Sequence, residues 1–185
     1  GRAMQEAVPV GVGSMAAVIS APAQEVERLC EEISSSRQEI VRVAVYNCPG
    51  NVVISGHVGA VDEVSERIVE QKLGMIRPLE VSAPFHTPLL APAAERLAQM
   101  LDSINIVANR KPVIPNVTAT VAPAGTEPDQ IRKWLVEQVV APVRWEESLR
   151  VALDLGVDRA FALGPGTMQR SHLKRISRRF PLVAM

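Results

Sequence analysis

The sequence predicts an α/β protein whose two halves are organised differently. Two observations predict this class. Short apolar strands alternate with amphipathic helical segments along almost the whole chain, which is typical of α/β folds. Strands dominate the first half, whereas helices separated by single short strands dominate the second. With 185 residues, of which 47% are hydrophobic, the chain is long enough to bury a real core.

The first half opens with an apolar strand at residues 15–20, and Pro22 then introduces a helix. Its apolar residues recur at the spacing of one helix face: Val26, Leu29, Cys30 and Ile33. Two β-branched strands follow at residues 41–46 and 51–54. The Asn-Cys-Pro-Gly sequence between these two strands is a strong turn signal and predicts a hairpin-like connection.

A second helix and a fourth strand complete this half. The helix is marked by Val61, Val64 and Ile68, and residues 76–81 predict the strand. The order over residues 15–81 is therefore β-α-β-β-α-β. This is the split arrangement of a ferredoxin-like unit.

The second half predicts helices with short strands between them. The first helix starts at Pro92. Its apolar stripe, in which we expect Met100 to belong to the core, consists of Ala93, Ala94, Leu97, Met100, Leu101 and Ile104. Further helices are expected at residues 129–140, at residues 146–155 and from Thr167, and strands at residues 112–117, 159–163 and 181–184. This alternation implies a mainly parallel sheet.

Composition excludes several classes of function. Twenty basic and twenty acidic residues balance, so no electrostatic surface points to nucleic acid or an anionic membrane as a partner. The two cysteines have no metal-ligand spacing, which indicates a reducing, cytoplasmic location and no metal site. No apolar run approaches the ~20 residues needed to span a bilayer. A glycine-rich stretch at residues 11–14 precedes a strand instead of following one, so a dinucleotide-binding fingerprint is not supported.

One histidine stands out as a candidate catalytic residue. His86 lies between Pro84 and Pro88, whose fixed backbone angles would present the ring from a restrained loop. Histidine is the usual general base for a serine nucleophile because its pKa lies near neutrality. The Gly-x-Ser-x-Gly elbow that would supply such a serine is absent from the 185 residues. A structural role for His86, as a helix cap or a partly buried residue, remains an alternative.

A cysteine and a histidine of this chain could form a catalytic pair without the absent serine. Cys48 and His86 would form a nucleophile and base if the two side chains met within hydrogen-bonding distance. Reactive thiols usually lie at helix N-termini, whereas Cys48 lies in a turn between two strands. The sequence therefore offers nothing to activate this thiol.

Several segments, taken in order, resemble one known family. Residues 1–9 and 46–57 are similar to a segment and a hairpin of that family, residues 81–90 to its histidine loop, residues 112–119 to a later strand, and residues 164–166 to a late turn. The family is that of the malonyl-CoA:acyl carrier protein transacylases, which includes the acyltransferase domains of polyketide and fatty acid synthases. Together these segments span nearly the whole chain.

The resemblance implies an activity and roles for three residues. In this family, a serine attacks the malonyl thioester of coenzyme A, and the phosphopantetheine thiol of an acyl carrier protein then takes the acyl group. His86 matches the general base, and Gln138 matches the residue whose backbone carbonyl orients that base. Phe85 occupies the position associated with the choice of extender unit, where a bulky ring would disfavour an α-methyl group; a packing role is the alternative. No cofactor and no metal are implied.

The resemblance also implies a domain organisation. Residues 1–14 would end a segment of the large subdomain, residues 15–81 would form the ferredoxin-like small subdomain, and residues 82–185 would form the C-terminal part of an α/β-hydrolase-like large subdomain with a mainly parallel sheet. The nucleophilic serine is expected upstream of Gly1. We therefore expect this chain alone to be inactive, and an N-terminal fragment carrying the serine to be a partner beside malonyl-CoA and the carrier protein.

Two questions stay open at this point. A function from another class, a non-catalytic docking or scaffolding fragment of a fatty acid or polyketide synthase, remains an alternative. The sequence also leaves open whether the parent is a free-standing enzyme or a module of a synthase.

Overall fold

A four-stranded antiparallel sheet organises the first half of the chain. The computed structural model describes residues 2–81, 83–163, 168–178 and 181–184. The strands are β1 (Gly13–Ile19), β2 (Val41–Cys48), β3 (Asn51–His57) and β4 (Met75–Pro78), and their order in the sheet is β2-β3-β1-β4. All three neighbouring pairs run antiparallel. The predicted hairpin is confirmed, with β2 and β3 joined through the expected turn.

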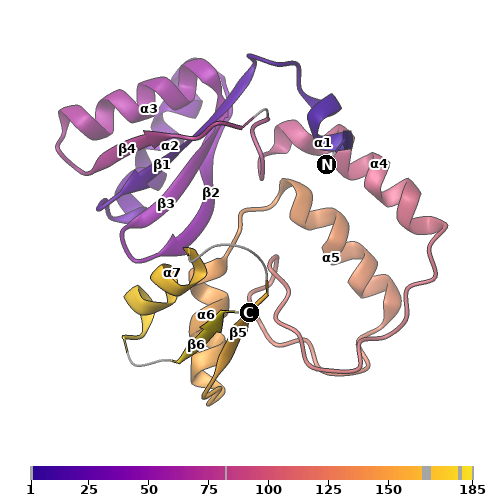
Figure 1. Cartoon of the computed structure of the whole chain (residues 1–185). Helices are drawn as coiled ribbons and strands as arrows, with labels where there is room; N and C mark the ends of the chain where they lie inside the picture. The colour runs from indigo at the N-terminus through magenta and orange to yellow at the C-terminus, as the bar shows by residue number, and fades with distance from the viewer. Residues whose placement is uncertain (1, 82, 164–167, 179–180, 185) are drawn as a thin grey trace.

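Two helices cover one face of this sheet and create the main core (Figure 1). Helix α2 (Ala23–Arg37) and helix α3 (Val58–Glu70) turn inward the apolar residues that the spacing predicted. These side chains meet alternate residues of the strands, such as Val18 and Ile54, neither of which is exposed. Burying each such side chain contributes about 1.5 to 3 kcal/mol relative to leaving it in water.

The opposite face of the sheet faces the second half of the chain. Met15, Ala44 and Val53 form a small buried cluster there, and Phe85 packs against it from a loop. The sheet is therefore apolar on both faces, and its second face lies against the segment that contains His86.

A second helical group lies beside the sheet (Figure 1). Helix α1 (Arg2–Ala7), the short 3-10 helix η1 (Pro88–Leu90), helix α4 (Ala91–Asp102) and helix α5 (Pro128–Val140) share one apolar cluster. The prediction for Met100 is wrong, because 57% of this residue is exposed. The buried stripe of α4 consists instead of Ala93, Ala94 and Leu101.

The last elements form a small parallel pair of strands with two helices. Helix α6 (Trp145–Asp154) is followed by β5 (Ala160–Ala162), helix α7 (Met168–Ile176) and β6 (Leu182–Ala184). Strands β5 and β6 pair in parallel. The predicted Gly-Pro-Gly turn at residues 164–166 lies outside the described residues, as does Thr167.

The prediction of a strand at residues 112–117 is wrong. Only Val113 pairs there, through an isolated antiparallel bridge to Ala122. The carbonyl of Pro115 instead accepts the N–H groups of Thr118 and Ala119 at 3.3 and 2.9 Å, which folds the segment into a turn. A β-branched run extends as a strand only beside a partner strand, and the described residues supply that partner at a single position.

Candidate active site around His86

The loop that carries His86 is held by its own hydrogen bonds. The fully buried hydroxyl of Thr87 donates to the Pro84 carbonyl at 2.8 Å, and the N–H of Leu90 donates to the Thr87 carbonyl at 3.1 Å. His86 itself adopts a left-handed backbone conformation with φ of 60°. A non-glycine residue in this region costs about 1 to 3 kcal/mol, and such strain clusters at functional sites. The loop therefore fixes the ring at an energetic cost to the fold.

Two backbone carbonyls fix the orientation of the imidazole. His86 Nδ1 lies 3.3 Å from the carbonyl oxygen of Gln138 and 3.1 Å from that of Ala141. Carbonyl oxygens only accept hydrogen bonds, so Nδ1 must carry the hydrogen. In the neutral ring this leaves Nε2 as an unprotonated acceptor. The ring is thus held in the tautomer that a general base requires.

The end of helix α5 explains why these carbonyls are available. The last carbonyls of any helix lack an intrahelical partner. The residue four places after Gln138 is Pro142, which has no N–H to donate. The last helical bond is instead from the Ala141 N–H to the Glu137 carbonyl, at 3.0 Å. The two carbonyl groups that face His86 are consequently free to accept its Nδ1–H.

Burial lowers the pKa of His86 below the usual value of 6.5. Desolvation is the larger effect because it disfavours the charged ring, and the two carbonyls partly oppose it by stabilising the imidazolium. His86 is therefore neutral at neutral pH and able to accept a proton. The carbonyl contacts would also stabilise the charged ring once the proton had arrived.

The structure brings two of the predicted site residues together, and it places the third, Phe85, among apolar side chains. His86 and the Gln138 carbonyl are in contact, and the Ala141 carbonyl, which the sequence analysis missed, lies closer. Phe85 is half-buried and packs between the sheet cluster and the cluster of α4 and α5. Its part in substrate selection stays a prediction.

Cys48 lies in a different environment from His86. Its thiol is buried, and the charges of Arg175 and Glu146 act on it. Burial raises the pKa of Cys48 despite a hydrogen bond and charge from Arg175 that lower it. A protonated thiol is a poor nucleophile, so the structure disfavours the cysteine and histidine pair.

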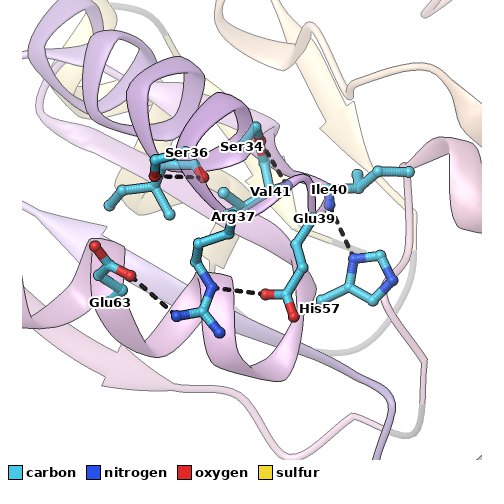
Figure 2. Close-up of polar contacts among 9 residues, drawn as sticks. Ser34, Ser36, Arg37, Glu39, Ile40, Val41, His57 and Glu63 are labelled. Atoms are coloured by element: carbon cyan, nitrogen blue, oxygen red, sulfur yellow. Dashed lines mark hydrogen bonds and ion pairs between the residues drawn. The ribbon is translucent and has the colours of Figure 1, made fainter.

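The other two histidines have structural surroundings. His57 Nδ1 accepts the Ile40 N–H at 2.9 Å, and the His57 N–H donates to the Ile40 carbonyl at 2.8 Å. Figure 2 shows this contact beside Arg37, which pairs with Glu39 and Glu63 at 2.8 and 3.1 Å and so joins α2 to α3. His172 is buried in α7. His57 therefore joins two backbone segments, and His172 is part of the buried face of α7.

The described part of the chain lacks two further features. No group of three or more His, Cys, Asp or Glu side chains there is arranged to hold a metal ion. Among the same residues, none of the helices combines the length and apolarity that crossing a membrane would require.

The chain belongs to the acyl transferase domain family, which its sequence matches over residues 1–162. Among curated proteins it is similar to the malonyl CoA-acyl carrier protein transacylase of Bacillus subtilis, with 38% identity over all 185 residues of the chain and 57% of that protein. The corresponding protein of Staphylococcus aureus is 33% identical over 59% of its length. The chain thus spans somewhat more than half the length of these relatives.

Solved structures agree with the sequence relatives. The structure of the transacylase from Coxiella burnetii matches 99% of this chain and 56% of its own, with a TM-score of 0.91 and 35% identity. A malonyl-transacylase in complex with a type II polyketide synthase acyl-carrier protein matches the whole chain and 58% of its own, with a TM-score of 0.92 and 33% identity. The α/β architecture with its small antiparallel sheet is therefore the acyltransferase fold of these enzymes.

Proposed function

We propose that this chain carries the general base of a malonyl-CoA:acyl carrier protein transacylase. The observation that carries the proposal is the carbonyl-fixed tautomer of His86, which leaves Nε2 free as a base. The names of the relatives supply the reaction, the transfer of a malonyl group to an acyl carrier protein. The proposed setting is fatty acid or polyketide biosynthesis in the cytoplasm.

The proposed mechanism has two steps that use the same ring. His86 Nε2 removes the proton of a serine hydroxyl outside these 185 residues, and the serine oxygen attacks the malonyl thioester. The carbon–sulfur bond breaks, and coenzyme A leaves as a thiol with the proton that His86 returns. In the second step His86 takes the proton of the carrier thiol, and the sulfur attacks the acyl-serine ester. The ester carbon–oxygen bond breaks, and the serine oxygen leaves with the proton that His86 returns.

The orientation of His86 by neutral carbonyls is compatible with this chemistry. A thioester can expel its leaving group as a thiolate, whereas an amine has to be protonated before it leaves, so the departure of a thiol demands less of the acid catalyst. The base then needs a fixed tautomer and direction more than it needs a charged partner. Gln138 and Ala141 would supply both through their backbones.

We also propose a division of the chain into subdomains. Residues 15–81 would form the ferredoxin-like small subdomain, supported by the strand order β2-β3-β1-β4 with α2 and α3 on one face. Residues 82–185 would form the later part of an α/β-hydrolase-like large subdomain, supported by the parallel pair of β5 and β6. Residues 1–14 would lead from the large subdomain into the small one.

Reconstitution tests the proposal. We would mix the chain with the serine-bearing N-terminal part of the Bacillus subtilis relative and measure transfer of labelled malonyl groups from coenzyme A to a carrier protein. Since general base catalysis contributes about 10² to 10⁴-fold, His86→Ala should reduce the transfer rate by at least about 100-fold. The matched control is His57→Gln, which changes a histidine whose ring bonds to the Ile40 N–H and not to the carbonyls of Gln138 and Ala141.

The outcomes separate the two functional classes. Equal rates for the His86→Ala variant and the unchanged chain would reject the general-base role. Carrier protein binding without any transfer in the reconstituted mixture would favour the docking fragment instead. Transfer by the 185-residue chain alone would contradict the expectation that a second segment supplies the nucleophile.

A further inference from the structure

Asn116 lies in the segment that was expected to be a strand, and both ends of its amide are engaged. Its Nδ2 donates to the carbonyl of Pro142 at 2.9 Å. Its Oδ1 accepts the N–H of Arg144, also at 2.9 Å. The partners are 26 and 28 residues away along the chain, so this one side chain clamps a distant turn.

The clamped turn is the one that presents a carbonyl to His86. It spans residues 141–144, between the end of α5 and the start of α6, and the Ala141 carbonyl faces His86 Nδ1 at 3.1 Å. On its other side, the Val143 N–H and carbonyl bond to Ala44 and Tyr46 of β2, each at 2.8 Å. The turn is thus tied to the sheet and to the histidine at the same time.

Asn116 bonds the two backbone polar groups of the turn that neither the helices nor the sheet satisfies. The Ala141 N–H and the Arg144 carbonyl belong to the neighbouring helices, through Glu137 and Ser148. The sheet satisfies both groups of Val143. The two groups that remain are the Pro142 carbonyl and the Arg144 N–H, and Asn116 satisfies both. Without this amide, two polar groups of the turn would lose their partners.

Side-chain packing does not replace the amide on the α5 side. A cavity of about 310 Å³ lies there, lined by Asn116, Gln138 and Trp134 among others. Arg144 Nη1 also donates to the Val117 carbonyl at 3.0 Å, so this long side chain is a second tie between the turn and the segment of Asn116. The Asn116 amide is the tie that bonds the backbone of the turn itself.

We propose that Asn116 is a positioning residue for His86, acting through the turn at residues 141–144. The proposal rests on the proposed role of His86 as the base, but its geometric content is independent of catalysis. Asn116 holds Pro142 and Arg144, which fixes the Ala141 carbonyl, which in turn holds the hydrogen on Nδ1. Loss of the clamp weakens the Ala141 contact and leaves the Gln138 carbonyl, at 3.3 Å, to hold the Nδ1–H tautomer, so the preference for that tautomer falls.

Nitrogen NMR of the labelled histidine rings in the purified chain tests this directly. The chain has three histidines, so variants at His57 and His172 assign the signals of His86. Asn116→Ala removes both bonds, and Asn116→Asp keeps an acceptor for Arg144 but sets an oxygen against the Pro142 carbonyl. For both variants we expect the ratio of the Nδ1–H to the Nε2–H tautomer of His86 to fall about fivefold, which corresponds to roughly 1 kcal/mol, one hydrogen bond.

Asn109 offers a matched control. Its Nδ2 donates to the carbonyls of Lys111 and Pro123 at 2.7 and 2.9 Å, and its Oδ1 accepts the Thr126 N–H at 2.8 Å. Asn109→Ala thus removes an amide clamp of the same kind from the same long loop. The bonds of this clamp go to Lys111, Pro123 and Thr126, and not to the turn of residues 141–144. The His86 signals should be those of the unchanged chain.

Each outcome decides for or against the proposal. Unchanged His86 signals in both Asn116 variants would overturn it. An equal change in Asn109→Ala would assign the effect to general loosening of the loop, as would loss of cooperative folding in both Asn116 variants, and either result would also overturn it. Because the NMR measurement needs no turnover, an unchanged transfer rate in the reconstitution with His86→Ala would reject the proposed function and leave this result standing.

Discussion

Gly13 lies directly against the loop that carries His86, so Gly13→Ala should disturb that loop. A Cβ built at Gly13 would lie 2.4, 2.5 and 2.8 Å from the Cγ, Cδ and Cβ atoms of Pro84. Carbon atoms prefer separations of about 3.5 to 4.0 Å, so the ring of Pro84 must move by about 1 Å. A proline ring cannot rotate away as a flexible side chain would.

The structure gives the scale of the effect. Pro84 is buried, its carbonyl holds Thr87, and His86 follows two residues later in a left-handed conformation. Overpacking of this kind costs about 1 to 3 kcal/mol. For a chain of this length that corresponds to a melting temperature lower by about 2 to 12 °C. We also expect the His86 ring signals to change, because the displaced residue belongs to the same loop.

A double-mutant cycle isolates the contact. Calorimetry would compare Gly13→Ala alone, Pro84→Gly alone and the two together. Pro84→Gly removes all three contacted atoms, so Gly13→Ala should cost less in that background. The reasoning is refuted if Gly13→Ala leaves the melting temperature unchanged, or if its cost is the same in both backgrounds.

Two further predictions concern protonation. Tyr46 is the only tyrosine in the sequence, and burial, followed by its 2.6 Å hydrogen bond to Glu27 and the charge of that residue, raises its pKa. Ultraviolet titration of the folded chain should therefore give a phenolate midpoint above the usual value of about 10, and Glu27→Gln should lower it only part of the way, because burial remains; a wild-type midpoint of 10 would contradict this. The second prediction concerns acid. Burial lowers the pKa of both His86 and His172 below 6.5, so the unfolded chain binds protons that the folded chain does not. The free energy of unfolding should be nearly constant between about pH 7 and 8 and should fall as the pH drops below 6.5, with a smaller fall in His172→Gln. Denaturant midpoints across this range measure it, and a flat profile would count against it.

The first half of the fold could be predicted from the sequence because its elements carry their own signals. Val26, Leu29, Cys30 and Ile33 recur at helical spacing, and all four are buried in α2. Helix, hairpin and second helix then leave few ways to pair the strands. Only boundaries differ there, as in β4, which ends at Pro78 instead of continuing to residue 81.

The second half was harder to predict because its signals depend on partners. Residues 112–117 have the composition of a strand, but the described residues pair with them only at Val113. Met100 fits the apolar stripe of α4, but none of the described elements covers it and the residue is exposed. Apolar spacing identifies which residues can be buried, whereas burial itself requires a neighbour.

One part of the candidate site could be predicted from the sequence and another part could not. His86 could be found because its side chain and the flanking prolines are visible in the sequence. The Ala141 carbonyl could not, because every residue has a backbone carbonyl and the side chain of alanine says nothing about it. The nearest available signal was Pro142, which cannot donate to the end of α5 and so leaves carbonyl groups free there.

The neutrality of the groups that hold His86 has a consequence for the conditions under which the site works. Dissolved salt screens interactions between charges, over about 10 Å at 0.1 M and about 3 Å at 1 M. A carboxylate partner would be weakened by this screening and would lose its charge in acid. The carbonyls of Gln138 and Ala141 have no charge to screen and no proton to gain. The direction of the imidazole should therefore be the same in dilute buffer and in concentrated salt.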